Sequence, residues 1–96
     1  ILQYLTLHLT EPITIDELAG RFYLSKYHMM RRFRQETGYT IHHYLMEKRL
    51  MLAQQLLRTG APLAQVCFDV GYQDYSTFSR AYKNHFGRAP SADTQR

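Results

Sequence analysis

The sequence predicts an all-α fold of about seven helices, in which two helix-turn-helix lobes are joined by a long linker helix. Apolar residues recur at helical rather than alternating spacing, and the 96 residues include only 5 Gly and 3 Pro. No Asn-Gly or Asp-Gly pair, the strongest short signal of a β-hairpin, occurs in the chain. In addition, the pattern of one segment recurs about 48 residues later, as in a duplicated unit. We therefore expect helices throughout and no strand.

The first two helices are predicted from spacing and capping. Residues 1–9 carry leucines at helical spacing, and Pro12 follows shortly as a break. Thr14, with Glu17 three residues later, forms the pattern of a capping box. This pattern predicts a short second helix that runs to about Phe22.

The middle of the chain predicts two further helices with defined ends. Ser25 is expected to cap a helix that runs to about Thr37, and Gly38 follows as a left-handed stop. Thr40 is expected to cap the long linker helix over about 41–59. At 1.5 Å per residue this linker measures about 28 Å, which is of the order of the roughly 34 Å between successive major-groove sites on B-DNA.

The last third of the chain predicts the second lobe. The segment 60–62 ends the linker, a short helix spans 63–70, and Gly71 forms the turn. A second basic helix, capped by Asp74, follows over 74–86 and is ended by Gly87. Because Gly60 and Gly71 both stand where a left-handed backbone is expected, replacing either with valine should impair folding.

The duplication relates the two lobes residue by residue. At an offset of 48 the matched pairs are Leu18/Val66, Ala19/Cys67, Phe22/Val70 and Leu24/Tyr72. At an offset of 49 they are Met29/Phe78, Arg31/Arg80, Phe33/Tyr82 and Gly38/Gly87. One additional residue in the second turn explains the change. We expect a first lobe over 1–38, a linker over 39–60 and a second lobe over 61–96, with each lobe gripping a DNA duplex.

The charge of the chain favours an anionic partner. Twelve Lys and Arg against eight Asp and Glu give a formal net charge of +4. Four of the cations, Lys26, Arg31, Arg32 and Arg34, fall within a stretch that contains no acidic residue. Such a concentration is typical of a nucleic-acid-binding element, although a short charge run can also be a solvated helix face.

Helical angles separate a buried stripe from a recognition face on each basic helix. Met29 and Phe33 form the buried stripe of the first, and Phe78 and Tyr82 that of the second. The candidates for base contact on the opposite faces are Tyr27, Met30, Arg31, Tyr75, Ser76, Thr77, Ser79 and Arg80. The candidates for phosphate contact are Lys26, Arg34 and Lys83.

The residue types suit this assignment. The arginine fork can pair with O6 and N7 of guanine, which gives about 1–3 kcal/mol of discrimination. The hydroxyl groups of serine and threonine can reach base edges or phosphates, and Tyr27 and Met30 offer apolar contact to a thymine methyl group. Phosphate contacts position the protein without reading the sequence.

The sequence does not predict a disulfide, a metal site, catalysis or contact with a membrane. A single cysteine, Cys67, excludes an intrachain disulfide and is typical of a reducing cytosol. His42 and His43 are adjacent rather than four apart, and no second cysteine supports a zinc site, so we expect no metal, no cofactor and no enzymatic activity. No apolar run or signal peptide predicts contact with a membrane.

The start at Ile1 suggests a fragment excised from a longer protein with an N-terminal effector or dimerisation domain.

A series of residues at fixed spacing carries a family resemblance. In the second half these are Arg49, Ala53, Leu56-Leu57, Val66, Val70-Gly71-Tyr72, Asp74, Ser76, Phe78-Ser79-Arg80, Tyr82-Lys83, Phe86-Gly87 and Ala89-Pro90. In the first half they are Leu18-Ala19, Leu24-Ser25, Arg31, Phe33 and Gly38. With these residues the chain resembles the AraC/XylS family of bacterial transcription factors.

The resemblance implies two recognition helices in adjacent major grooves of double-stranded DNA. It also implies a cytoplasmic, nucleoid-associated bacterial regulator, commonly an activator that contacts RNA polymerase, with any small-molecule effector bound by a separate domain. The chain departs from the family pattern at Cys67, where alanine is usual, and at Asp93, where an aromatic residue is usual. We expect Cys67 to pack as a small apolar residue. An acid at position 93 is not expected to anchor a last helix, so residues 91–96 should form only a final turn or fray.

One alternative function is also compatible with the sequence. A helix-turn-helix domain can serve protein contact alone, and four of the eight tyrosines, Tyr4, Tyr23, Tyr39 and Tyr44, are candidates for such an interface. The same tyrosines can equally be half-buried around a small core. Binding that weakens steeply with salt would indicate DNA, whereas a mostly apolar protein interface would not show this dependence.

Overall fold

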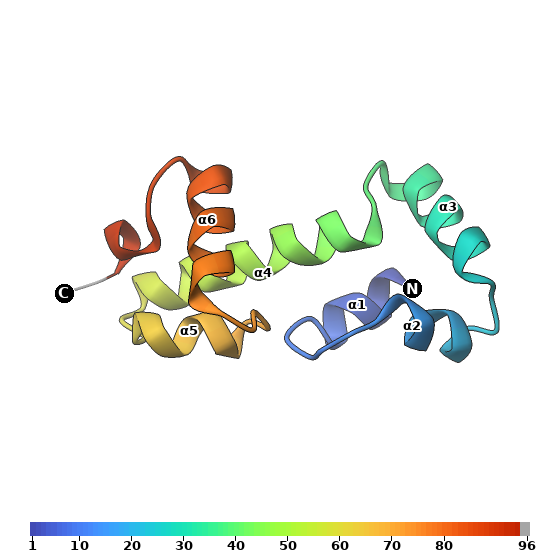
Figure 1. Cartoon of the computed structure of the whole chain (residues 1–96), viewed down its shortest axis with the longest axis horizontal. Helices are drawn as coiled ribbons and strands as arrows, with labels where there is room; N and C mark the ends of the chain where they lie inside the picture. Colours follow the sequence, from blue (N-terminus) through green and yellow to red (C-terminus); the bar gives the residue numbers. More distant parts are fainter. Residues whose placement is uncertain (95–96) are drawn as a thin grey trace.

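The computed structural model describes residues 1–94, which form an all-helical chain with no strand, as the sequence predicts. Figure 1 shows the arrangement of these elements. They are α1 (Leu2–Leu7), α2 (Ile15–Arg21), α3 (Lys26–Thr37), α4 (Ile41–Arg58), α5 (Leu63–Asp69), α6 (Tyr75–Phe86) and the 3-10 helix η1 (Pro90–Asp93). Within residues 1–94, no helix is long and apolar enough to span a membrane.

Side-chain caps start four of the six α-helices, where the sequence places them. The hydroxyl oxygens of Thr14, Ser25 and Thr40 each accept a hydrogen bond from the backbone N–H three residues later, at 3.1, 3.1 and 3.0 Å. Asp74 caps α6 in the same way at 2.8 Å. The helix starts are predictable because a cap depends on residues that are close together in the sequence. The first helix is shorter than expected and covers only Leu2–Leu7.

Two hydrophobic cores lie at opposite ends of the long helix α4. The first core consists of Leu5, Leu18, Ala19, Met29, Phe33, Ile41 and Leu45. The second consists of Leu50, Ala53, Leu57, Val66, Cys67, Val70, Tyr72, Phe78 and Tyr82. Full burial of a leucine or phenylalanine contributes roughly 1.5–3 kcal/mol, so each core stabilises one helix-turn-helix unit. Cys67 is fully buried as a small apolar residue, as expected.

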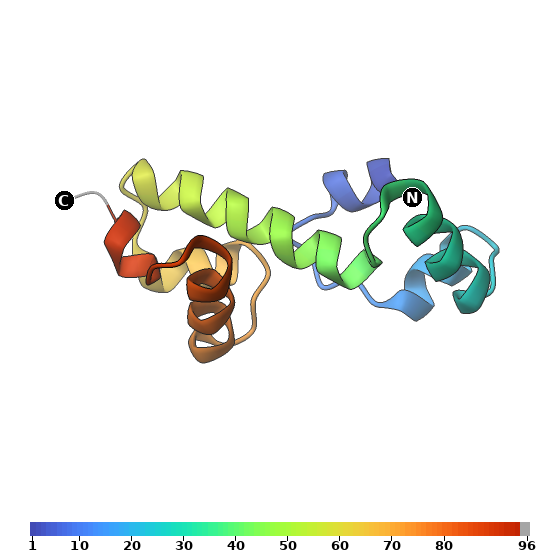
Figure 2. The ribbon, with the colours of Figure 1, turned by 90° about the horizontal axis from the view of Figure 1, so that it is seen from above.

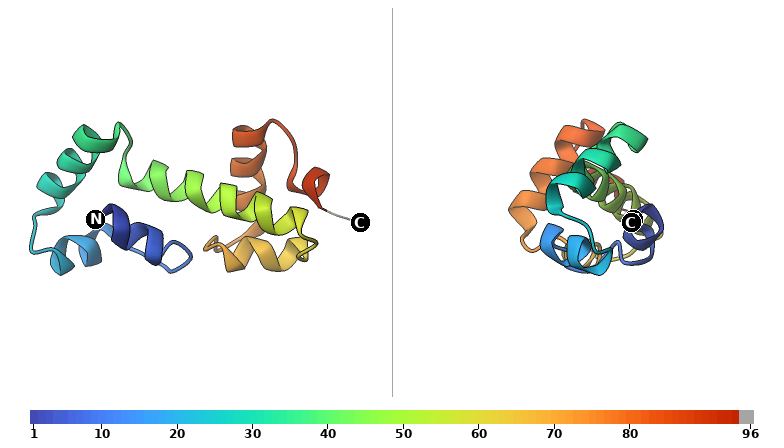
Figure 3. Two further views of the ribbon diagram at one scale, coloured as in Figure 1. Left: turned by 180° about the vertical axis from the view of Figure 1, so that it is seen from behind. Right: turned by 90° about the vertical axis from the view of Figure 1, so that its right-hand side faces the viewer.

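The molecule is elongated along α4, and its two helix-turn-helix units project from it. It measures 46 × 21 × 21 Å, and the 18 residues of α4 correspond to about 27 Å of helix. Figure 2 shows α4 running between the two units. In the end-on view of Figure 3, α3 and α6 lie toward the same side of α4, and α1 lies toward the other. The second helices of both units are therefore presented on one side of the molecule.

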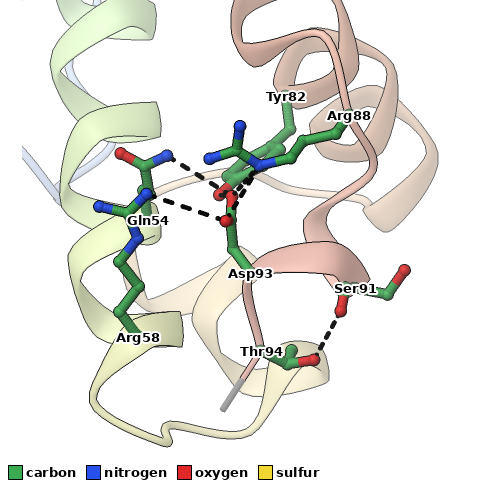
Figure 4. A network of polar contacts seen from close by, with 7 residues as sticks. All are labelled: Gln54, Arg58, Tyr82, Arg88, Ser91, Asp93 and Thr94. Carbon is green, nitrogen blue, oxygen red and sulfur yellow. Dashed lines mark hydrogen bonds and ion pairs between the residues drawn. The ribbon is translucent and has the colours of Figure 1, made fainter.

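Asp93 anchors the C-terminal 3-10 helix, and the expectation that an acid could not do so was wrong. Its side chain is only 7 % exposed. The carboxylate accepts hydrogen bonds from the hydroxyl of Tyr82, from Nε of Arg88 at 3.0 Å and from Nε2 of Gln54 at 3.5 Å (Figure 4). The guanidinium of Arg58 lies 4.0 Å away. An aromatic residue is unnecessary here, because donors from α4 and α6 converge on the acid. Residues 95 and 96 of the predicted final turn lie outside the described residues.

The ionisation of Asp93 is set by two opposed effects. Burial raises the pKa of this carboxyl, but the hydrogen bonds from Tyr82, Arg88 and Gln54 outweigh it and hold the pKa below its ordinary value. Burial and the hydrogen bond to Asp93 raise the pKa of Tyr82. The phenol therefore keeps its proton and serves as a donor to the carboxylate.

Replacing Asp93 with alanine is expected to lower the free energy of unfolding by about 1.5–3 kcal/mol, because a charged acceptor with several donors is lost. Asp93→Asn should cost less, since its amide oxygen can still accept from Tyr82. Because the folded-state pKa is lowered, the stabilisation is present above the unfolded pKa of about 3.9 and is lost as the pH falls through the folded value. The gap in thermal midpoint between the wild type and Asp93→Ala should therefore shrink on acidification. A gap that stays constant down to about pH 2 would contradict this assignment.

Candidate nucleic-acid interface

The first recognition face lies on α3, where the structure brings its predicted residues together. Met29 and Phe33 are buried at 0 % and 3 % exposure and fix the inner side of the helix. Tyr27 and Met30 on the outer side are 67 % and 43 % exposed. Arg31 is exposed beside them. The helical angles therefore predicted the division between core and surface correctly.

A hollow with a partly apolar lining lies beside this face. It is lined by side chains of α3 and of the starts of α2 and α4, namely Ile15, Tyr27, Met30, Arg31, Arg34, Thr40, Ile41 and His42. Apolar groups thus adjoin two guanidinium groups. This combination can receive a thymine methyl group beside a guanine or a phosphate.

The cations of the first face differ in their pairing. Nζ of Lys26 lies 3.0 Å from Oδ1 of Asp16 on α2, so this predicted phosphate contact is partly neutralised in the free protein. Arg32 pairs with Glu36 along α3 at 3.0 Å. Arg31 and Arg34 have no carboxylate within 4.0 Å among residues 1–94, so their charges are available to an anionic ligand. The sequence did not reveal the Asp16 pairing, because the two residues belong to different helices.

The second recognition face lies on α6. Asp74 accepts two hydrogen bonds from the first turn of this helix. The backbone N–H of Thr77 donates to Oδ1 of Asp74, and the hydroxyl of Thr77 donates to Oδ2 at 2.9 Å. These two hydrogen bonds hold the pKa of Asp74 below its ordinary value, and Arg80 contributes by its charge. The Thr77 hydroxyl was expected to reach bases or phosphates. In the free protein it is engaged by Asp74, which leaves the methyl group of Thr77 for contact.

The remaining predicted residues of α6 are exposed with one exception. Tyr75 is 42 % exposed, and Ser76, Arg80 and Lys83 are also at the surface. Ser79 is only partly exposed, contrary to the angle predicted for it. Nε of Arg80 lies 3.5 Å from the carbonyl oxygen of Ser76 one turn earlier, so its side chain lies back along the helix.

The two faces differ in the charge of their capping residues. The cap of α3 is neutral Ser25, whose hydroxyl also lies 3.1 Å from Nδ1 of His28. The cap of α6 is the carboxylate of Asp74. A helix N-terminus attracts phosphate, and a carboxylate at the same position opposes its close approach. We therefore expect phosphate binding at a helix start to be stronger at α3 than at α6.

The residues considered for other functions lie on several separate elements. Among residues 1–94, no group of three or more His, Cys, Asp or Glu is placed to hold a metal ion. Of the tyrosines considered for a protein interface, Tyr4 packs against Phe22 and Tyr44 against Phe33, and both are partly buried. Tyr23 is 96 % exposed in the turn between α2 and α3, and Tyr39 is 45 % exposed between α3 and α4.

Comparison with known proteins identifies the family. A family model described as "Helix-turn-helix domain" matches residues 18–96. Regulatory protein SoxS of Salmonella typhimurium is 35 % identical over 92 residues, which cover 95 % of this chain and 86 % of that protein. A solved transcriptional regulator of Chromobacterium violaceum, described as containing an AraC-type DNA-binding domain, is 29 % identical with a TM-score of 0.84, and the match covers 96 % of this chain and 83 % of that one. The chain belongs to the AraC family.

Membership of the AraC family makes this chain a DNA-binding domain of the transcription-regulator type and not an enzyme. The DNA-binding domain of AdpA, solved in complex with a target DNA, is 28 % identical with a TM-score of 0.89. That match covers 95 % of this AraC-family chain and 83 % of the AdpA chain. The right origin-binding protein of Escherichia coli is 32 % identical, and this chain spans 32 % of its length.

Proposed function

We propose that this AraC-family domain binds double-stranded DNA in a sequence-specific manner, with α3 and α6 in adjacent major grooves on one side of the duplex. The observation that carries the proposal is the placement of both helices on the same side of α4, each with an exposed arginine at the matched position. The 46 Å length of the molecule exceeds the roughly 34 Å between successive major-groove sites. The molecule is therefore long enough to span two successive major grooves.

Under this proposal the first lobe (1–38) and the second lobe (61–96) each read one box of bases, and the segment 39–60 separates them. The proposed base contacts are Tyr27, Met30 and Arg31 on α3 and Tyr75, Ser76, Thr77, Ser79 and Arg80 on α6. The proposed phosphate contacts are Lys26, Arg34 and Lys83. Thr77 contributes through its methyl group, and Lys26 exchanges Asp16 for a phosphate on binding.

We further propose that the domain acts in a bacterial transcription regulator in the cytoplasm, at the nucleoid, and that it contacts RNA polymerase in activation. Its membership of the AraC family and its similarity to the regulatory protein SoxS support this role. Any small-molecule effector is proposed to act through a separate domain. A promoter-reporter assay in bacteria would test activation directly.

The salt dependence of DNA binding tests the proposed function. Three phosphate contacts predict that log K for a duplex of about 30 base pairs falls against log salt with a slope of about −3 or steeper, through released counterions. Alanine at Lys26, Arg34 or Lys83 should each reduce the slope by about 1. The matched control is Lys48→Ala on α4, since Lys48 lies beside Tyr44 and α1, away from the recognition faces. A slope near zero would favour the alternative of a domain used only for protein contact.

A further inference from the structure

Arg49 is a buried cation that connects α4 to the chain of the first lobe. It is 6 % exposed, the only charged residue among the buried ones in residues 1–94. Its Nε donates to the carbonyl oxygen of Leu9 at 2.8 Å, and its Nη2 donates to that of Glu11 at 2.9 Å. Two backbone acceptors in the loop between α1 and α2 thus satisfy one planar guanidinium. Arg49 therefore fixes this loop against the middle of α4.

The same guanidinium is in contact with the turn of the second lobe. A Cβ atom built on Gly71 would lie 2.9 Å from Nε and 3.1 Å from Cζ of Arg49, and 3.1 Å from the carbonyl oxygen of Thr10. Figure 1 shows the loop between α1 and α2 beside the turn between α5 and α6, and Figure 3 shows the same two segments side by side from behind. Arg49 therefore lies where the two lobes meet, with one lobe on each side of it.

Arg49 has no ion-pair partner that would explain its burial. No carboxylate lies within 4.0 Å of it among residues 1–94, and burial lowers its pKa. Burying an arginine is costly unless its hydrogen bonds are made, and an apolar side chain would fill a core position of α4 at lower cost. The burial of Arg49 is therefore explained by the geometry of its contacts, which link the two lobes, and not by the net stability that these contacts add.

We propose that Arg49 is a positioning residue that holds the two lobes in a fixed orientation and thereby restricts the spacing of the two DNA boxes that the domain accepts. The inference rests on the proposed function, because spacing has meaning only if both lobes contact one duplex. Linking two binding units raises their combined affinity most when the linker matches the distance between their sites. If the orientation of the two units varies, this gain in affinity is distributed over several spacings. Loss of the Arg49 contacts should therefore change the spacing preference more than the affinity for one box.

The first test measures the orientation without DNA. Nitroxide labels at the matched, exposed positions Gln35→Cys and Asn84→Cys, in a Cys67→Ala background, report the distance between α3 and α6. The domain with Arg49 should give one narrow distance distribution. Arg49→Met should at least double its width, whereas Lys48→Met, which removes an exposed charge at the neighbouring position, should leave it unchanged. A distribution of unchanged width and mean in Arg49→Met would overturn the proposal.

The second test uses duplexes that carry the two boxes at different spacings. The wild type should prefer its optimal spacing over one that is a base pair longer by about tenfold, and Arg49→Met should reduce this preference to about threefold or less. Both proteins should bind a single-box duplex equally. If the wild type shows no spacing preference, the proposed binding of two grooves is wrong. The distance distribution between the two nitroxide labels then still shows whether Arg49 holds the lobes in one orientation.

A conservative variant keeps the tests decisive if Arg49→Met does not fold. Arg49→Lys retains the charge and the aliphatic stem but lacks the planar fork that serves two carbonyl oxygens. It should give an intermediate width of the distance distribution and an intermediate spacing preference. Wild-type values for both in a folded Arg49→Lys domain would show that the fork does not position the lobes.

Discussion

Replacing Gly71 with valine is expected to lower the free energy of unfolding by about 2–5 kcal/mol. The backbone φ of Gly71 is +105°, a left-handed conformation that costs a residue with a Cβ atom about 1–2 kcal/mol. The Cβ atom would also lie 2.9 Å from Nε of Arg49 and 3.1 Å from the backbone oxygen of Thr10. Overpacking of this kind adds about 1–3 kcal/mol. Chemical denaturation monitored by circular dichroism measures the loss.

Gly60 provides the matched control for this prediction. Its φ is +96°, so valine there meets a similar backbone penalty, but no atom lies within 4 Å of its built Cβ position. Gly60→Val should therefore cost only about 1–2 kcal/mol. The sequence alone predicts the same impairment at both positions, and the structure separates them by what surrounds each glycine. Equal losses at the two sites would show that the contact with Arg49 and Thr10 is relieved without cost.

Arg31→Ala and Arg80→Ala are each expected to weaken binding to a specific site by about 5- to 150-fold, which corresponds to the 1–3 kcal/mol of an arginine–guanine pair. Both arginines are exposed at matched positions on α3 and α6, on the side of the helix opposite the buried stripe. Binding to random DNA should weaken far less, since only one charge is lost. Titrations of both variants against specific and random duplexes at one salt concentration measure the two effects.

Arg32 offers a control for the loss of charge on α3. It is exposed on the same helix but pairs with Glu36 at 3.0 Å, and it does not line the hollow that Tyr27, Met30 and Arg31 share. Arg32→Ala should therefore weaken specific and random binding by the same small factor. If Arg31→Ala or Arg80→Ala shows the same loss on both DNAs, that arginine contacts phosphate and does not read bases.

The features predictable from the sequence are those that depend on neighbouring residues. The caps at Thr14, Ser25, Thr40 and Asp74 involve a partner three residues away, and the buried stripes follow from helical angle alone. The engagement of the Thr77 hydroxyl was missed, although Asp74 three residues earlier was a sufficient signal. When an acid caps a helix and a threonine stands at the third helical position, the carboxylate can accept hydrogen bonds from both the backbone N–H and the hydroxyl of the threonine.

The features missed depend on residues far apart in the sequence. Asp93 binds Gln54, 39 residues away, and Arg49 binds Leu9, 40 residues away. An acid or an arginine in such a position has no local signature, because its partners are brought together only when the lobes fold. The partial burial of Ser79 has a similar origin, since exposure depends on neighbouring elements as well as on helical angle.

Selection of bound duplexes from a random pool tests most directly whether α3 and α6 both read DNA in adjacent major grooves. The wild type should select two short boxes whose centres lie about 10 base pairs apart. Arg31→Ala should lose the sequence preference in one box, and Arg80→Ala should lose it in the other. A single box for the wild type, or the same box lost in both variants, would contradict the account.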